Sequence, residues 1–327
     1  MILSISELQA ATHGAVRLEQ TESGVRFWRM TEAQKQFYLD RNDEMHIRNS
    51  KHSAGVRLSF LTDSRSLSLS ADLWPDLCGA GVGFDVCEDG VLIAHLGEEN
   101  KEATDLCTPL SEGEHLVEIY FPWGKGVTLK KLCLDDGATF TPHHRKHRLL
   151  AFGDSITHGS LATYPSMSYI ERLAVLLDAD LDNRGIGGDH FSAGVAELEP
   201  VENPDVVTVA YGTNDWSHWG ACFDEECPKM LKILSERYPS ADIFVITPIW
   251  RGDWDREGSM KLRLPDLCEK IREYASPYSN VHVINAWNFV PHLPAFFGEG
   301  HLHPNDLGFG VYAERIYQEI LKITKKV

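Results

Sequence analysis

The chain has 327 residues, of which 43% are hydrophobic and 24% are charged, a composition typical of a soluble globular protein with room for two domains. It carries 48 acidic side chains against 31 basic ones, which gives a formal net charge of −17. Because this much negative charge repels phosphate backbones and anionic bilayers, we expect neither a nucleic-acid partner nor a membrane partner.

The N-terminal sequence and the cysteines favour a cytoplasmic protein. The first 20 residues lack the basic segment and long apolar run of a secretion signal, and no stretch approaches the roughly 18 apolar residues of a membrane helix. The cysteines are odd in number and none forms a CxxC pair, so we expect reduced and mostly buried thiols. They are Cys78, Cys87, Cys107, Cys133, Cys222, Cys227 and Cys268.

Residues 1–145 are predicted to form an antiparallel β-domain. Apolar and polar residues alternate in several of its segments, and turn-forming residues separate them. The expected strands are 55–61, 66–74, 81–88, 91–97, 115–121 and 127–134. Their spacing is typical of a sandwich or jelly-roll-like domain. Residues 29–53 fit this pattern less well, and we expect them to be irregular or partly helical.

The basic segment 141–148, TPHHRKHR, is expected to link this domain to a second one at residues 146–327. Its three histidines, His143, His144 and His147, raise the question of a metal site. Because no carboxylate or cysteine completes such a site, we interpret the segment as a solvated linker and expect no metal.

From residue 148 onward, short apolar runs alternate with amphipathic segments. The expected strands are 148–153, 180–186, 205–212, 242–249 and 281–287, and the expected helices are 166–179, 227–238, 264–275 and 306–324. The strands are continuous and rich in Val and Ile, as in parallel strands covered on both faces. The alternation predicts a doubly wound α/β domain, in which ligands bind at the carboxyl ends of the strands.

Four residues stand at those expected strand ends. Ser155 follows the first strand in Gly-Asp-Ser, Gly188 follows the second in RGIGGDH, and Asn214 follows the third in GTND. His303 precedes the last helix. Each has an ordinary structural explanation on its own, since serine and asparagine cap helices and glycine forms turns. The glycine-rich loop does not match GxGxxG, so we expect no dinucleotide and no other cofactor.

Taken together, the four residues fit nucleophilic acyl chemistry. A serine hydroxyl becomes a nucleophile when a base lies within hydrogen-bond reach, and His303 could be that base. An oxyanion needs donors, which the backbone N–H groups of Ser155 and Gly188 and the side-chain amide of Asn214 could supply.

In this order the four blocks resemble the SGNH (GDSL-type) hydrolases, a family of esterases and lipases named after Ser, Gly, Asn and His. The resemblance covers residues 148–327 and implies a flavodoxin-like three-layer α/β/α fold. It implies Ser155 as the nucleophile, Gly188 and Asn214 in the oxyanion hole, and His303 as the general base. The preceding jelly-roll-like domain is similar to that of family-two carbohydrate esterases and of SGNH proteins related to polyketide acyltransferases.

The chain departs from the family at one position. The family usually has an aspartate three residues before the histidine, where this sequence has Gly300. The backbone carbonyl of Gly300, the side chain of Glu299, or a carboxylate from another loop could orient the histidine instead. We favour the Gly300 carbonyl, because it keeps the expected position without needing a side chain. We interpret Asp154 as a structural hydrogen-bonding residue, and we do not expect His158 or His301 to touch substrate.

The expected activity is that of a serine esterase removing a small acyl group, with acetyl favoured, from a polar small molecule such as a sugar. Acyl transfer to an alcohol stays open, because nothing in the sequence separates it from hydrolysis. An inactive glycan-binding protein is a third reading, suggested by the missing aspartate. Trp216, Trp250 and Arg251 on loops of the active face, and Trp123 in a turn of the β-domain, are candidates to hold substrate, although core packing explains Trp123 equally well.

Overall fold

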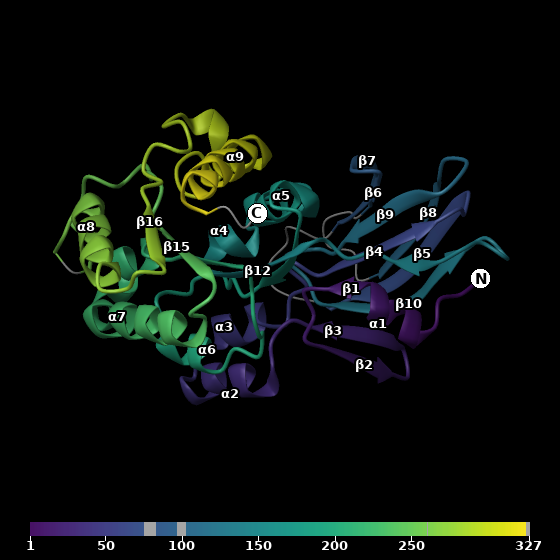
Figure 1. The fold of residues 1–327 in the computed structure, drawn as a ribbon, viewed down its shortest axis with the longest axis horizontal. Helices are drawn as coiled ribbons and strands as arrows, with labels where there is room; N and C mark the ends of the chain where they lie inside the picture. The colour runs from purple at the N-terminus through teal and green to yellow at the C-terminus, as the bar shows by residue number, and fades with distance from the viewer. Residues whose placement is uncertain (75–82, 97–102, 260, 325–327) are drawn as a thin grey trace.

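The computed structural model of this chain describes residues 1–74, 83–96, 103–259 and 261–324. Figure 1 shows antiparallel strands gathered at the N-terminal end of the molecule and a helix-covered sheet at the other end. Cys78 and parts of the strands expected at 81–88 and 91–97 lie outside the described residues.

Two antiparallel sheets form the β-domain, as the sequence predicts. The first sheet has the order β1 (Thr12–His13), β4 (Arg57–Thr62), β9 (His115–Tyr120), β6 (Phe84–Glu88) and β7 (Val91–Leu96), with β11 (Thr141–Pro142) on β4. The second has the order β2 (Arg17–Thr21), β3 (Gly24–Trp28), β10 (Val127–Leu134), β5 (Ser66–Leu73) and β8 (Ala103–Pro109). Helix α1 (Ile5–Ala11) precedes β1. Apolar residues of both sheets, such as Phe60 and Leu69, share one buried core.

Residues 29–53 do not belong to this sandwich. They form α2 (Glu32–Asp40), which begins with a capping box between Thr31 and Gln34, and α3 (Glu44–Asn49), which Asp43 caps. Met30 and Tyr38 are buried in the core of the second domain, and Figure 1 shows α2 and α3 against that domain. A segment of the first half therefore completes the packing of the second.

The second domain is built on a parallel sheet of five strands, as expected. Its order is β13 (Ala179–Asn183), β12 (His147–Gly153), β14 (Val206–Ala210), β15 (Asp242–Ile246) and β16 (Val281–Ile284). All five strands are parallel, but β13 is added on one side of β12 and β14 on the other. The order in which strands are added to the sheet therefore reverses between β12 and β14. Ligand sites of such sheets form at the carboxyl ends of the strands at this point.

Helices cover both faces of the parallel sheet (Figure 1). On one face lie α5 (Tyr169–Leu176) and α9 (Asp306–Ile323). On the other lie α6 (Ala193–Glu197), α7 (Gly220–Arg237) and α8 (Leu264–Ala275), together with α2. The short elements are α4 (Ser155–His158), η1 (Pro165–Met167), η2 (Asp215–Trp219) and η3 (Pro294–Phe296). The layers make the α/β/α sandwich that the sequence predicts.

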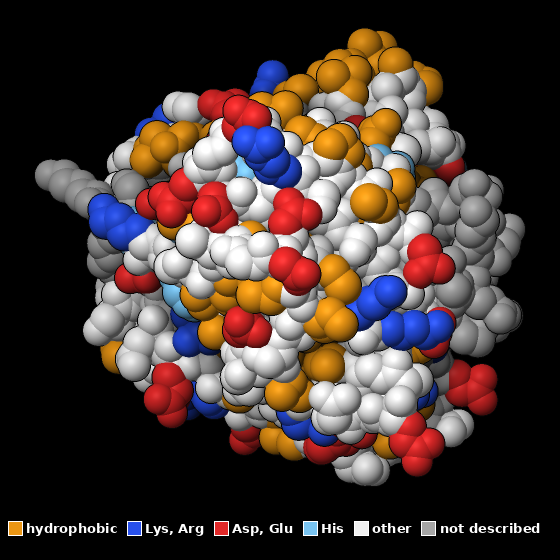
Figure 2. Space-filling view, turned by 90° about the vertical axis from the view of Figure 1, so that its right-hand side faces the viewer, with side chains coloured by type: hydrophobic (Ala, Val, Ile, Leu, Met, Phe, Trp, Pro, Cys, Tyr) orange, Lys and Arg blue, Asp and Glu red, His pale blue; other side chains and the backbone are white. Residues whose placement is uncertain are grey.

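The surface mixes charged and apolar side chains, and the described cysteines are less buried than expected. Figure 2 shows acidic and basic side chains interspersed with apolar ones over the end of the molecule that carries the β-domain. The six described cysteines are free thiols; Cys87, Cys227 and Cys268 are buried, Cys133 is half-buried, and Cys107 and Cys222 are exposed. Among the helices of the described residues, none combines the length and the hydropathy needed to cross a bilayer.

Candidate active site

Ser155 begins the one-turn helix α4 directly after the central strand β12. The carboxylate of Asp154 caps this helix by accepting the backbone N–H of Ile156 at 2.9 Å. Burial raises the pKa of Asp154 to about 6. Asp154 therefore holds the turn that carries the serine.

Ser155 lies beside His303 although 148 residues separate them in the sequence. The serine Oγ is 2.7 Å from His303 Nε2, and His303 Nδ1 is 3.1 Å from Oε1 of Glu299. The same Glu299 oxygen accepts the backbone N–H of His303 at 2.5 Å. Burial raises the pKa of Glu299, but the hydrogen bonds from His303 outweigh it and lower the pKa below its ordinary value. Serine, histidine and an ionised carboxylate thus form one hydrogen-bonded chain.

The expectation that the Gly300 carbonyl orients the histidine is wrong. The carboxylate of Glu299 takes that place, one residue further from His303 than the aspartate of the family. Gly300 has a φ of +89°, a left-handed conformation that glycine adopts without strain and that turns the chain between Glu299 and His303. The longer glutamate side chain covers the additional residue. His301 stays exposed, with its Nδ1 3.2 Å from the backbone oxygen of Glu299.

Two further strand ends carry the residues that are expected to donate to an oxyanion. Asn214 follows β14, and its Nδ2 donates to the Asp189 carbonyl at 2.8 Å, which leaves the second amide hydrogen available. Within the described residues, the backbone N–H groups of Ser155 and Gly188 have no hydrogen-bond partner. Three donors from three strand ends are therefore open to a ligand.

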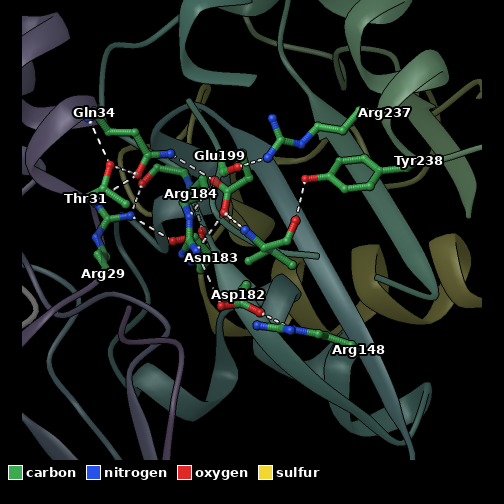
Figure 3. A network of polar contacts seen from close by, with 12 residues as sticks. Arg29, Thr31, Gln34, Arg148, Asp182, Asn183, Arg184, Glu199, Arg237 and Tyr238 are labelled. Carbon is green, nitrogen blue, oxygen red and sulfur yellow. Dashed lines mark hydrogen bonds and ion pairs between the residues drawn. The ribbon is translucent and has the colours of Figure 1, made fainter. Parts of the chain in front are cut away.

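The loop that carries Gly188 is held by residues of the first half of the chain. The buried guanidinium of Arg29 donates to the carbonyls of Asn183 and Gly185 at 3.1 and 2.7 Å. Burial lowers the pKa of Arg29 to about 9, which still leaves it charged at neutral pH. Asn49 Nδ2 donates to the Gly187 carbonyl at 2.9 Å. Figure 3 shows Arg29 reaching this loop from the N-terminal segment.

A second set of buried contacts continues from the same segment (Figure 3). Gln34 donates to Glu199 at 2.9 Å, and Arg184 donates to both oxygens of that carboxylate at 2.8 and 3.0 Å. Breaking one partner of a buried charge pair leaves the other uncompensated, so such a network favours one arrangement of its loop. Arg184 stands directly before Gly185. The network therefore fixes the start of the loop at residues 183–189, which carries Gly188 and is called the oxyanion loop below.

His158 supports this loop from the serine side. Its Nδ1 accepts the Gly187 N–H at 2.9 Å, and its Nε2 lies 2.9 Å from the Trp123 carbonyl, so we assign the neutral tautomer with the proton on Nε2. Burial, together with the charges of Arg29 and His52, holds the pKa of His158 well below its ordinary value. A buried, neutral His158 joins the serine helix to the oxyanion loop.

For two of the four expected substrate-binding side chains, Trp216 and Trp123, the prediction is wrong. Trp216 is 0% exposed and donates its indole N–H to Leu262 O at 2.8 Å. Trp123 is also buried and donates to Ala162 O at 2.8 Å. Neither ring has a face to offer a sugar, because both pack inside the molecule. The pattern of alternating tryptophans and polar residues in a loop does not tell which way a ring points.

The other two expected substrate-binding side chains, Arg251 and Trp250, differ in their burial. Arg251 is largely buried, pairs with Asp253 at 2.6 Å, and stacks over the Trp216 ring at 4.9 Å. Trp250 is half-buried and stacks on His292, with ring centroids 4.9 Å apart. Their loop contacts the histidine loop, because the Gly252 N–H donates to His301 O at 2.8 Å. The half-buried Trp250 ring also packs edge-on against Phe297, with centroids 5.5 Å apart.

The residues with metal-ligand chemistry lie elsewhere. His13, His144 and Asp180 bring their ligand atoms within 4.8 Å of one another, so a carboxylate does meet a linker histidine, which the sequence did not indicate. Arg57 lies 2.8 Å from the same carboxylate and already balances its charge. Asp180 stands at the start of β13, whereas Ser155 follows the carboxyl end of β12, so this cluster lies at the opposite edge of the sheet.

Comparisons with known proteins agree with this geometry. Residues 151–311 match the GDSL-like Lipase/Acylhydrolase family. No curated protein sequence matches the chain.

Solved structures match nearly the whole chain. The salicylyl-acyltransferase SsfX3 from a tetracycline biosynthetic pathway is 22% identical, with a TM-score of 0.80 over 95% of this chain and 94% of its own. A family two carbohydrate esterase from Cellvibrio japonicus is 17% identical, with a TM-score of 0.65 over 97% and 96%. One from Clostridium thermocellum, in complex with cellohexaose, is 16% identical, with a TM-score of 0.64 over 95% and 98%. At these identities the likeness shows a shared fold.

Proposed function

We propose that this chain, whose residues 151–311 form a GDSL-like lipase/acylhydrolase domain, is a serine esterase acting on a small acyl ester of a polar molecule, with an acetylated carbohydrate as the favoured substrate. One observation carries the proposal. The Ser155 hydroxyl, the His303 ring and the Glu299 carboxylate are linked by contacts of 2.7 and 3.1 Å, next to three open donors.

The reaction uses these groups in sequence. Ser155 Oγ attacks the ester carbonyl carbon while His303 Nε2 takes the hydroxyl proton. The negative oxygen of the tetrahedral intermediate is bound by the Ser155 and Gly188 N–H groups and the Asn214 amide. His303 then gives its proton to the leaving alcohol, and the carbon–oxygen bond to that alcohol breaks. Glu299 keeps the proton of the neutral ring on Nδ1 and stabilises the imidazolium.

The acyl-enzyme is then released by water. His303 removes a proton from a water molecule as the oxygen attacks the acyl carbon, and the proton passes to Ser155 Oγ when its bond to the acyl group breaks. The products are a carboxylic acid and the free enzyme. No redox partner or external acid is needed.

Support for the substrate class comes from the similar structures and from the chain's own charge. Two of those structures are family two carbohydrate esterases, and one of them is described with cellohexaose. A polar neutral sugar ester suits a strongly acidic protein, because it carries no anionic group for the net charge of −17 to repel.

Acyl transfer to an alcohol is the second candidate. The likeness to a salicylyl-acyltransferase extends over 95% of the chain, including the β-domain. Hydrolysis and transfer share the acyl-enzyme and differ only in whether water or an alcohol attacks it.

The test measures turnover of p-nitrophenyl acetate by the wild-type chain and by the Ser155→Ala variant, with Ser160→Ala as the matched serine control. A fluorophosphonate should label Ser155, and the Ser155→Ala variant should lose both label and turnover. Labelling of another serine, or full activity of that variant, contradicts the proposal. Mass spectrometry of acetylated sugars with and without acceptor alcohols then separates acid from transferred ester.

A further inference from the structure

We propose that Met45, from the first half of the chain, forms the wall of the acyl-binding side of the active site and sets the length of acyl group that the enzyme accepts. This inference rests on the proposed function and identifies a residue that governs its substrate specificity. Met45 lies in α3, 110 positions before the serine nucleophile by sequence number.

The first step is the position of Met45 over the oxyanion glycine. A Cβ atom placed on Gly188 would lie 2.1 Å from Met45 Cε and 3.0 Å from its Sδ. The methionine methyl group thus occupies the space next to the Gly188 Cα, one bond away from the N–H that would bind the oxyanion. Any larger residue at 188 would displace Met45, in addition to the strain of its φ of +87°.

The second step is that polar contacts hold α3 in place while the Met45 side chain is exposed. Asp43 caps the helix and pairs with His46, and Asn49 donates to the Gly187 carbonyl at 2.9 Å. Met45 between them is 39% exposed. An exposed, flexible thioether beside a polar site is an adaptable apolar surface for a ligand.

The third step assigns this surface to the acyl side. The proton for the leaving alcohol comes from His303, so the alcohol part of the ester must lie toward the histidine loop. The strand order β13-β12-β14-β15-β16 places the loop after β13, which carries Gly188, on the opposite side of Ser155 from the loop after β16, which carries His303. The carbonyl oxygen faces the Gly188 N–H, so the acyl chain leaves the carbonyl carbon on the side away from His303, and we assign Met45, which lies beside the Gly188 Cα, to its wall. An acetyl methyl group fits against the thioether, and a longer chain must displace it.

The experiment compares the kcat/KM for p-nitrophenyl acetate with that for p-nitrophenyl butyrate. Met45→Ala should raise the butyrate-to-acetate ratio by at least about tenfold, since a change of one methylene in an apolar pocket changes kcat/KM by about 10- to 200-fold. Met45→Phe should lower the ratio. Leu39→Ala is the matched control, because Leu39 is an exposed apolar residue of neighbouring α2 and is not among the atoms nearest to an added Gly188 Cβ. Circular dichroism and the Tm confirm that each variant is folded.

The outcomes separate this inference from the proposed function. A ratio that stays within twofold in both Met45 variants, while Ser155 is still labelled and acetate is still hydrolysed, overturns the role of Met45 alone. A wild-type chain that hydrolyses no ester and takes no fluorophosphonate overturns the proposed function and this inference with it.

Discussion

The two loops that meet at Ser155 are held in opposite ways. The oxyanion loop at residues 183–189 is largely buried and is fixed by side chains distant in the sequence, such as Arg29 and Asn49. The histidine loop at residues 299–303 is partly exposed, and the carboxylate that orients His303 comes from the loop itself.

This difference separates two catalytic requirements. Oxyanion donors act best when they are already in position and shielded from water, because they then need no reorganisation during the reaction. A general base must instead exchange protons with alcohol and water, and a self-contained loop at the surface suits that role. The contrast implies that part of the catalytic geometry depends on the first half of the chain and part does not.

The largest expected effect tests the self-contained loop. Glu299→Gln should lower the kcat for p-nitrophenyl acetate by roughly ten-thousandfold, as in the serine protease triad, because the amide no longer selects the tautomer or stabilises the imidazolium. The fold should be unchanged, and the exposed Glu257→Gln variant serves as control. Turnover within tenfold of wild type would show that another group orients His303.

The oxyanion side should show a smaller loss. Asn214→Ala removes one donor and should cost about a hundred- to a thousandfold in kcat, with little change in KM. Asn288→Ala, at an exposed position in the same domain, is the matched control. A loss of only a fewfold would make Asn214 a turn residue that binds the Asp189 carbonyl and nothing more.

The dependence on the first half is tested by Asn49→Ala. Loss of its hydrogen bond to the Gly187 carbonyl should loosen the oxyanion loop and lower kcat by about ten- to a hundredfold, since a displacement of about 1 Å can cost a hundredfold. The control is Gln36→Ala on α2, whose side chain binds Asp40 at the surface. An equal fall in both variants, or a fall in thermal stability alone, would remove the distinction between the two loops.

The smallest effect concerns the turn of the histidine loop. Gly300 and Gly137 both have positive φ, and neither has an atom within 4 Å of an added Cβ. Alanine at either position should cost about 1–2 kcal/mol in urea unfolding, because an L-residue resists the left-handed conformation. Only Gly300→Ala should also lower kcat, by a fewfold, and Gly300→Asn should restore it. Equal activity of the two alanine variants would mean that the turn does not position Glu299.

Much of the architecture is readable from local pattern. Continuous runs rich in Val and Ile predict the parallel strands because both of their faces are buried. The sequence does not predict the strands β2, β3 and β8; in β2, polar residues interrupt the alternation, as RLEQT illustrates. The capping sequences of α2 and α3 indicate partial helicity, but which domain these helices cover depends on contacts far away in the chain.

The active site likewise combines residues that local sequence patterns predict with residues whose roles depend on contacts distant in the chain. Ser155, Gly188, Asn214 and His303 stand at ends of regular elements, where topology brings them together without detailed knowledge of side chains. The sequence leaves Glu299 as one of three alternatives, because its reach depends on the backbone turn at Gly300. The contact of Arg29 with Gly185 spans 156 positions and has no local signal. Whether Trp216 faces inward is likewise decided by the packing around it.

The burial of Met30 and Tyr38 in the second domain has a consequence for the order in which the molecule is assembled. During synthesis from the N-terminus, these side chains emerge well before Phe191 and Val209, which share their core. The β-domain can close around its own core earlier. The helical segment at residues 29–53, called the helical arm, stays exposed to solvent until the parallel sheet has formed. Cutting the chain at residue 145 would therefore give two incomplete pieces: one with an uncovered apolar arm and one with an uncovered core. The two halves of this protein are separate in architecture and joined in folding.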